Sequence, residues 1–187
     1  MRVISGKARG RKLKMVPGDT TRPIMDRVKE NLFNLLGPDF VPGSRWLDLF
    51  AGTGQVGIEA LSRGAAEVVF LDTARAAIRT IHDNLQHTQL SDGAKVIQAD
   101  AFAYLRELRQ PPFDVIYIAP PQYKGVWVAV MELLDTRPGQ FLTPDGLAIV
   151  QIDPREYEAL ALKRLAIYDE RRYGNTALIF YEQGAPA

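Results

Sequence analysis

Acidic residues and glycines follow one another here at spacings that suit a nucleotide-type ligand. Asp48 lies in an apolar run, and the turn Ala51-Gly52-Thr53-Gly54 comes directly after that run. Glycine lacks a Cβ, so the backbone can turn sharply and a ligand can approach it closely. The helix predicted from Gln55 to Arg63 would present unpaired N–H groups and the positive end of its dipole. Together these residues predict a strand, a glycine turn and a helix that bind a nucleotide-type cofactor.

Two more carboxylates stand where the next two strands are expected to end. Asp72 comes 20 residues after Gly52, a spacing that suits a carboxylate accepting hydrogen bonds from ribose hydroxyls. Asp100 is followed by Ala101 and Phe102, which could read an adenine edge and offer an apolar wall. Each carboxylate could instead only cap a turn or helix. Because ligands of open α/β sheets bind at the carboxyl ends of strands, a shared edge favours the ligand site.

A rigid turn, Ala119-Pro120-Pro121-Gln122-Tyr123, follows the fourth expected strand. Gly52, Gly54 and Gly57 also satisfy the spacing Gly-x-Gly-x-x-Gly, so the glycines alone leave a dinucleotide enzyme open. Hydride transfer has no need of a Pro-Pro turn, whereas Pro-Pro followed by an aromatic suits holding a flat base against a methyl donor. The turn therefore favours methyl transfer.

Apolar strands alternating with helical stretches must position these residues. Strands such as Val68–Asp72 and Phe113–Ala119 are nearly continuous apolar runs, which indicates a parallel sheet with helices on both faces. The last two strands are joined by Gly174-Asn175, which predicts an antiparallel hairpin. We expect five parallel strands and this hairpin, hence seven strands. The strands predicted are Trp46–Phe50, Val68–Asp72, Lys95–Ala99, Phe113–Ala119, Leu147–Ile152, Leu165–Arg171 and Ala177–Glu182; the helices after the first strand are Gln55–Arg63, Ala74–Gln86, Ala101–Leu108, Val126–Leu134 and Arg155–Leu160.

Basic residues are concentrated at the start of the chain. The net charge of the 187 residues is +1, yet residues 1–30 hold nine basic and three acidic groups, net +6, which leaves −5 for the rest. Residues 2–16 alternate apolar and basic positions, so we expect a hairpin or two short strands, and a helix from about Pro23 to Leu36. The asymmetry indicates a polyanion contact, with a solvated terminal arm as the alternative.

Composition excludes several other classes. The chain has no cysteine and two histidines, so disulfides, thiolate nucleophiles and a zinc-thiolate site are excluded, and no metal is expected. No apolar run is long enough to span a membrane, and the basic N-terminus lacks the apolar core of a signal sequence. We expect one domain, 1–187, with a basic extension at 1–40 and a cofactor-binding and catalytic core at 41–187, in a cytoplasmic protein.

The sequence resembles a known family. Leu47-Asp48-Leu49-Phe50-Ala51-Gly52-Thr53-Gly54 and Glu59-Ala60-Leu61-Ser62-Arg63-Gly64-Ala65 look like the cofactor site of the bacterial small-subunit ribosomal RNA guanine-N2 methyltransferases. The resemblance extends to Arg2-Val3-Ile4-Ser5-Gly6, Thr21-Arg22-Pro23 and Glu30-Asn31-Leu32-Phe33-Asn34, and so covers nearly the whole chain. It implies an α/β, Rossmann-like class I methyltransferase fold, in which a seven-stranded, mostly parallel sheet ends in an antiparallel hairpin and a small basic hairpin and helix precede it.

The resemblance also implies a cofactor, S-adenosyl-L-methionine, and a partner, ribosomal RNA in the small subunit or its assembly intermediate. We expect a monomer. By this likeness the methionine part of the cofactor is surrounded by the first strand and turn, Asp72 holds the ribose, and Asp100 with Ala101 holds the adenine. The cofactor residues are Asp48, Phe50, Ala51, Gly52, Thr53, Gly54, Asp72, Asp100 and Ala101; the RNA-binding residues are Arg2, Lys7, Arg9, Arg11, Lys12, Lys14, Arg22 and Arg27; the catalytic residues are Ala119, Pro120, Pro121, Gln122 and Tyr123.

One departure from the family concerns catalysis. The family's turn is Asp- or Asn-Pro-Pro followed by Tyr or Phe, whereas this chain has Ala119 first and Gln122 before the aromatic. The lost side chain would accept an N–H of the guanine amine, and such a loss typically costs about 10²–10³ in rate. Gln122 could replace the acceptor, or the Pro120 carbonyl could suffice at a reduced rate. The chain could also bind cofactor and RNA without methylating, as an assembly factor, or methylate adenine or a DNA amine.

Overall fold

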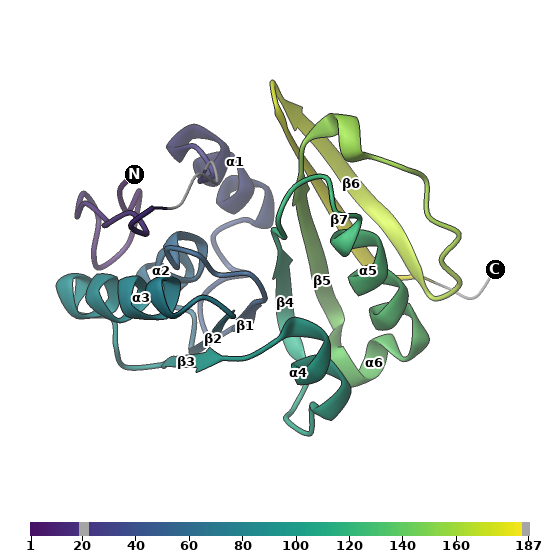
Figure 1. Cartoon of the computed structure of the whole chain (residues 1–187), viewed down its shortest axis with the longest axis horizontal. Coiled ribbons are helices and arrows are strands. Elements are labelled where there is room, and N and C mark those ends of the chain that lie inside the picture. The colour runs from purple at the N-terminus through teal and green to yellow at the C-terminus, as the bar shows by residue number, and fades with distance from the viewer. Residues whose placement is uncertain (19–22, 185–187) are drawn as a thin grey trace. The chain divides into compact units, whose positions relative to one another are not determined.

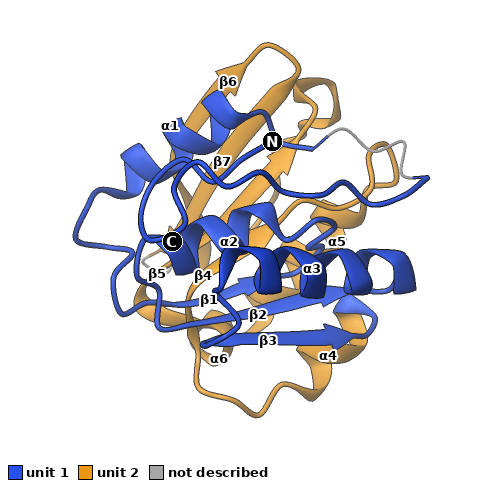
Figure 2. Ribbon diagram, turned by 90° about the vertical axis from the view of Figure 1, so that its left-hand side faces the viewer, with its two compact units in different colours: residues 1–101 blue, residues 102–187 orange. Residues whose placement is uncertain are grey.

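A parallel three-stranded sheet and its helices form the first of two compact units, Met1–Ala101 (Figure 2). This computed structural model describes residues 1–18 and 23–184. The strands lie in the order β3-β2-β1, and α2 and α3 pack against them on the same side (Figures 1 and 2). The elements are α1 (Asp26–Leu36), β1 (Arg45–Asp48), α2 (Gln55–Ser62), β2 (Glu67–Asp72), α3 (Arg75–Thr88) and β3 (Ala94–Gln98).

The core of this unit lies on both faces of β1 and β2. Trp46 and Leu47 in β1 and Val68 to Leu71 in β2 are fully buried, as the continuous apolar runs predict for a sheet covered on both faces. The ring of Phe33 in α1 stacks on Trp46, with centroids 5.4 Å apart. Gly57 allows α2 to pack closely on β2, because a Cβ there would lie 2.3 Å from Cε1 of Phe70.

The second unit, Phe102–Ala187, is a mixed sheet with the order β4-β5-β7-β6. β4 and β5 are parallel, and β7 pairs antiparallel with both β5 and β6. α4 begins at the last residue of the first unit. The elements are α4 (Ala101–Glu107), β4 (Phe113–Ile118), α5 (Val126–Thr136), α6 (Pro138–Phe141), β5 (Leu142–Ile152), the 3₁₀ helix η1 (Pro154–Glu156), β6 (Leu165–Tyr173) and β7 (Thr176–Gln183).

The predicted fold class is confirmed in its elements. The described residues form seven strands, of which β1 to β3 are parallel in the first unit and β4 and β5 in the second. The terminal hairpin turns at Gly174, whose φ is +58°. That 1–187 is a single domain stays a prediction. Within the described ranges no helix has both the length and the apolar character needed to cross a membrane.

The helix predicted at 155–160 is wrong. A 3₁₀ helix at Pro154–Glu156 takes its place, and residues 157–164 form no helix. The Asp153 side chain accepts a hydrogen bond from the Arg155 N–H, and the Glu156 side chain accepts one from the Asp153 N–H. This capping box closes a single turn. The chain then runs back to Asp135 in α5, whose carboxylate accepts the N–H groups of residues 163, 164 and 165.

Of the two alternatives predicted for the N-terminal segment, the structure shows a hairpin without regular strands: the N–H groups of Val3 and Leu13 donate to the carbonyls of Arg11 and Met1. Only an isolated antiparallel bridge, Arg2 to Lys12, is formed among its described residues. The N–H groups of Ile4 and Ser5 are bound by Glu59 in α2, at 2.8 and 3.0 Å. The segment therefore directs part of its backbone hydrogen bonding to a helix and not to a second strand, which alternation of residue types could not reveal.

Candidate cofactor and catalytic sites

The carboxyl ends of β1, β2 and β3 bring the predicted cofactor residues of the first unit to one edge. Asp48 is the last residue of β1 and Asp72 the last of β2. Asp72 pairs in register with Gln98 of β3, and its carbonyl accepts the Ala99 N–H at 3.1 Å. Asp100 follows directly. The sequence therefore located these three carboxylates at a common strand edge, while their roles stay predictions.

Asp72 ties the glycine turn to the start of α3. Its Oδ2 accepts the Gly52 N–H at 2.9 Å, and its Oδ1 accepts the Ala74 N–H at 2.9 Å. The capping alternative is thus partly correct, because one oxygen does bind the backbone at the helix start. A carboxylate oxygen can accept two hydrogen bonds, so each oxygen keeps acceptor capacity for a ligand hydroxyl.

Asp48 is almost completely buried, at 2% exposure. Burial raises the pKa of its carboxyl to about 7, and the negative charge of Asp72 adds to the rise. The Gly57 N–H, 3.4 Å from Oδ2, opposes the rise in pKa, but less than burial promotes it. The group is therefore poised to exchange a proton near neutral pH, and a cation bound beside it would favour the charged form.

The glycine turn leaves room for a ligand. A Cβ at Gly52, where φ is +54°, would have no atom within 4 Å. At Gly54, where φ is +76°, a Cβ would lie 3.3 Å from Cγ1 of Ile81. Phe50 is half-buried, and Ala51, Thr53 and Ala101 are buried. Open space beside a carboxylate with spare acceptors and an apolar surround fits the nucleoside and methionine parts of S-adenosylmethionine.

The predicted catalytic turn belongs to the second unit. Pro120 is buried and Ala119 half-buried, while Pro121, Gln122 and Tyr123 are exposed. Within the described part of the chain the Gln122 amide has no hydrogen-bond partner. The alanine at position 119 offers no side-chain acceptor, and the exposed Gln122 amide is not used by the described protein residues.

Sequence reasoning missed three residues that hold this turn. The Tyr123 hydroxyl donates to Asp153 Oδ2 at 2.7 Å and accepts from Arg155 Nη2 at 2.6 Å. The backbone N–H of Tyr123 donates to Oε1 of Glu156 at 2.5 Å. The signal available was the pattern Asp-Pro-x-Glu after an apolar strand, which is a capping box with proline at the first helical position.

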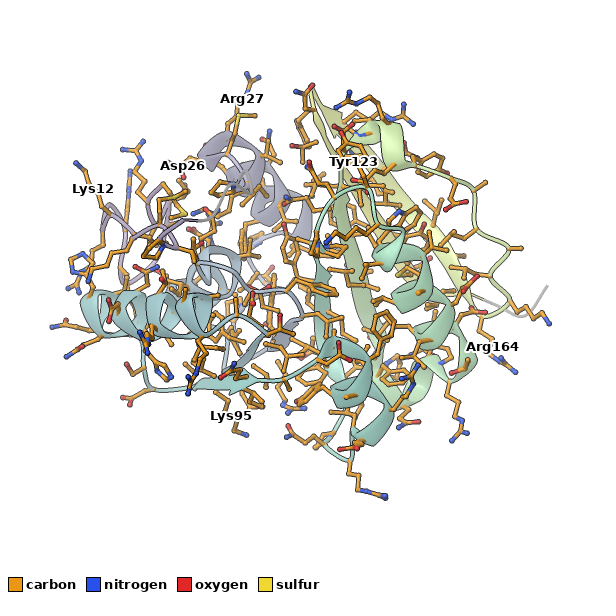
Figure 3. The ribbon with its side chains drawn as sticks, in the orientation of Figure 1. Lys12, Asp26, Arg27, Lys95, Tyr123 and Arg164 are labelled. Atoms are coloured by element: carbon orange, nitrogen blue, oxygen red, sulfur yellow. The ribbon has the colours of Figure 1, made fainter. Side chains whose placement is uncertain are left out.

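The basic segment presents cations over a small apolar base. Val3, Ala8 and Leu13 are buried between the charged positions. Arg2 and Lys14 approach carboxylates, at 3.8 Å from Asp26 and 2.9 Å from Asp83, and Arg11 donates to the His87 carbonyl and to Gln89. Arg22 lies outside the described residues. Four exposed cations form no ion pair with any described residue: Lys7, Arg9, Lys12 and Arg27. Of these, Lys12 and Arg27 extend away from the ribbon (Figure 3).

A buried ion pair anchors this segment to α2. Glu59 and Lys29 are both fully buried, with 3.6 Å between Oε2 and Nζ. Burial lowers the pKa of Lys29, although Glu59 and Asp26 counteract it. Lys29 donates to the Arg2 carbonyl at 2.6 Å, and Glu59 also accepts from Arg63 at 2.7 Å. The sequence offered Glu59 and Arg63 as part of a motif but gave no sign of this anchoring.

The parallel sheet, the glycine turn and the carboxylates at the edge of the first sheet are those of the Rossmann-like methyltransferase fold class. Comparisons with known proteins narrow the class. The model of the family described as "Conserved hypothetical protein 95" matches residues 1–182, and the chain belongs to that family.

Relatives of this chain carry ribosomal RNA methyltransferase names. It is 39% identical over 185 residues to the Bacillus subtilis protein named "Putative rRNA methyltransferase YlbH", with 98% of this chain and 99% of that protein covered. It is 36% identical to ribosomal RNA small subunit methyltransferase D of Haemophilus influenzae, covering 94% of each. A solved structure of a hypothetical protein from Thermus thermophilus has a TM-score of 0.82 at 32% identity, covering 97% of this chain and 99% of that chain. The predicted family resemblance is thereby confirmed.

Proposed function

We propose that this protein transfers a methyl group from S-adenosylmethionine to the exocyclic N2 amine of a guanine in small-subunit ribosomal RNA. The observation that carries the proposal is the Asp72 carboxylate, which holds the glycine turn with one oxygen and the start of α3 with the other, and keeps acceptors for a ribose. The family membership and the names of its relatives supply the RNA substrate class. Cytoplasmic location and a monomeric state are parts of the same proposal.

The first unit holds the cofactor. Asp72 accepts the ribose hydroxyls, Asp100 and Ala101 bind the adenine, and Asp48 with the turn Phe50 to Gly54 surrounds the methionine part. The cofactor supplies an activated methyl group when it is bound. The residues of the chain orient that group and exclude water from it, so no metal and no covalent intermediate on the protein are required.

The turn of the second unit holds the base. A guanine amine is a poor nucleophile, since its lone pair is delocalised into the ring. The Pro120 carbonyl accepts one N–H, the Gln122 amide oxygen replaces the acceptor absent at Ala119, and Tyr123 stacks on the ring. The guanine must first be unstacked from its RNA neighbours to reach the turn.

The basic segment grips phosphates by charge and without sequence readout. Replacing Lys7, Arg9 and Lys12 together with Glu should weaken RNA binding, and the slope of log affinity against log salt should become shallower by about 2, since each single-strand phosphate contact contributes about 0.7. Affinity for the cofactor should not change. Lys163→Glu, which alters an exposed cation of the second unit, is the matched control. Equal loss of both affinities would count against the assignment.

The decisive experiment offers labelled S-adenosylmethionine to small ribosomal subunits that lack methylation, and to the naked RNA, followed by nucleoside analysis. We expect N2-methylguanosine. Methyladenosine would assign the protein to the amino-methyltransferases of adenine, and methylation of DNA alone would remove the RNA substrate. Binding of cofactor and RNA without transfer would favour an assembly factor. That role is the main rival to the proposed function because of the alanine at position 119.

Two variants separate the possible roles of the turn. If Gln122 replaces the lost acceptor, Gln122→Ala should lower kcat about 10²-fold, and Ala119→Asn should restore most of that activity in the same chain. If the Pro120 carbonyl suffices alone, Gln122→Ala should have little effect while Ala119→Asn raises kcat in the unaltered background. Gln86→Ala, an exposed glutamine on α3, is the control for a general effect of losing an amide.

A further inference from the structure

Tyr123 occupies a backbone conformation that its own residue type disfavours. Its φ is +59°, in the left-handed region, and it is one of two non-glycine residues with positive φ among those described. The residue is 59% exposed, so packing alone does not fix the ring. A strained residue with an exposed ring keeps one orientation only if other groups hold it.

Three hydrogen bonds from one turn provide that hold. Asp153 accepts from the Tyr123 hydroxyl, Arg155 donates to it, and Glu156 accepts from the Tyr123 N–H. The Arg155 guanidinium carbon also lies 5.6 Å from the centroid of the tyrosine ring. Both ends of Tyr123, the backbone and the hydroxyl, are therefore fixed to the residues that follow β5.

The turn that holds Tyr123 is itself rigid. Asp153 is 4% exposed and binds both the N–H and the guanidinium of Arg155, at 2.9 and 2.7 Å. Glu156 closes the capping box by accepting the Asp153 N–H. These bonds hold the pKa of the Asp153 carboxyl far below its usual range, with the Arg155 side chain as the largest cause. The carboxylate thus stays charged, and bonds to a charged acceptor are the stronger kind.

We infer that Asp153, Arg155 and Glu156 are positioning residues that fix Tyr123 in its stacking orientation before the RNA base arrives. The inference rests on the proposed function, in which Tyr123 stacks on the guanine. A ring that is already oriented costs no ordering when the base binds, so the benefit falls on the productive complex. Figure 3 marks Tyr123 on the loop after β4, which packing leaves open to solvent.

A double-mutant cycle tests the inference. Tyr123→Phe removes the hydroxyl and keeps the ring, and Arg155→Gln removes a guanidinium whose side chain is 75% exposed, so neither change threatens the core. Each should lower kcat about tenfold, the factor that one hydrogen bond to a charged group typically carries. Cofactor affinity should stay the same. In the Tyr123→Phe background, Arg155→Gln should have a clearly smaller effect, because its bond to the hydroxyl is already lost and only its contacts with the ring and with Asp153 remain.

The matched controls are Tyr168→Phe and Arg171→Gln. Tyr168 is 61% exposed, and Arg171 pairs with Asp169 two residues before it, as Arg155 pairs with Asp153. Both controls should leave kcat unchanged. The inference is overturned if Arg155→Gln lowers kcat by the same factor in both backgrounds. It is equally overturned if Arg155→Gln raises KM for RNA to the same extent in the Tyr123→Phe background, because the guanidinium would then be a direct contact.

A second readout needs no methyl transfer. In protein labelled with ¹³C at its seven tyrosine rings, the Tyr123 signal is identified by its loss in Tyr123→Phe. Arg155→Gln should increase the mobility of that ring, and Arg171→Gln should not. If the unaltered protein transfers no methyl group, the proposed function fails, while the ring mobility still decides whether the turn holds Tyr123. Unchanged mobility in Arg155→Gln would refute the hold itself.

Discussion

The buried carboxyl of Asp48 makes folding stability depend on pH in a predictable direction. Its pKa rises from the ordinary 3.8 to about 7 in the folded protein. Between these two values the folded state binds more protons than the unfolded state, so stability falls as pH rises through this range. At roughly 1.36 kcal/mol for each pH unit, the full effect is about 4 kcal/mol. Asp48→Asn cannot titrate, and it keeps an oxygen for the Gly57 N–H.

The assay compares urea unfolding of the two proteins from pH 4 to pH 8, followed by the fluorescence of Trp46 and Trp127. All other groups titrate in both proteins, so the difference isolates Asp48. From pH 4 to pH 8, the free energy of unfolding of Asp48→Asn should rise by about 4 kcal/mol relative to that of the unaltered protein. Asp135→Asn is the control: burial raises the pKa of Asp135, but three backbone N–H groups outweigh it and lower the pKa overall, below the ordinary 3.8. Its titration therefore lies below this pH range, and the difference for Asp135→Asn should stay nearly constant from pH 4 to pH 8. A difference for Asp48→Asn that stays constant with pH would refute the reasoning.

Two further predictions concern the anchoring of the basic segment. Glu59→Gln should destabilise the protein by about 3–5 kcal/mol in urea unfolding, because Lys29 is left buried without its partner, and adding Lys29→Met should recover part of the loss; no recovery would argue against the ion pair as the cause. Gly6 and Gly10 share a φ of +82°, but a Cβ at Gly6 would lie 1.8 Å from the Ser62 carbonyl oxygen, whereas none lies within 4 Å at Gly10. Gly10→Ala should therefore lower the free energy of unfolding by about 1 kcal/mol from strain alone. Only Gly6→Ala should lower it by several times more. Only Gly6→Ala should also flatten the salt dependence of RNA binding, which titration at several salt concentrations measures.

Strand ends were predictable from the sequence because burial on both faces leaves a continuous apolar run that a carboxylate terminates. Asp72 ends its strand for this reason, whereas the strand predicted at Trp46–Phe50 ends two residues earlier, at Asp48, because Leu49 and Phe50 already belong to the turn. The glycine at position 57 reflects contact between α2 and Phe70. Local patterns of this kind need only neighbouring residues. They located the edge of the first sheet, although the roles of the residues on it remain proposals.

Contacts between distant residues were not predictable in the same way. Glu59 binds the N–H groups of Ile4 and Ser5, which lie 55 and 54 positions earlier in the chain. Tyr123 binds Asp153 and Glu156, which lie 30 and 33 positions later. Such pairings follow from topology and not from periodicity. The prediction of a helix at 155–160 failed for a related reason: the capping box of Asp153 and Glu156 closes a single turn, and the chain then runs to Asp135, which accepts the N–H groups of residues 163 to 165.

In the proposed function, the residue at position 119 and the turn Asp153 to Glu156 act on different parts of the base. The alanine at position 119 leaves the guanine amine without a side-chain acceptor. The turn at Asp153 to Glu156 fixes the Tyr123 ring, which stacks on the flat face of the guanine. Losing the acceptor costs about 10²–10³ in rate, and positioning recovers activity by a separate route. If the two are independent, the gain from Ala119→Asn in the Gln122→Ala background should be the same factor with or without Arg155→Gln, so their free-energy effects add. A gain that disappears in Arg155→Gln would mean that the amine is reached only when Tyr123 is held, and that ring orientation limits transfer more than the missing acceptor does.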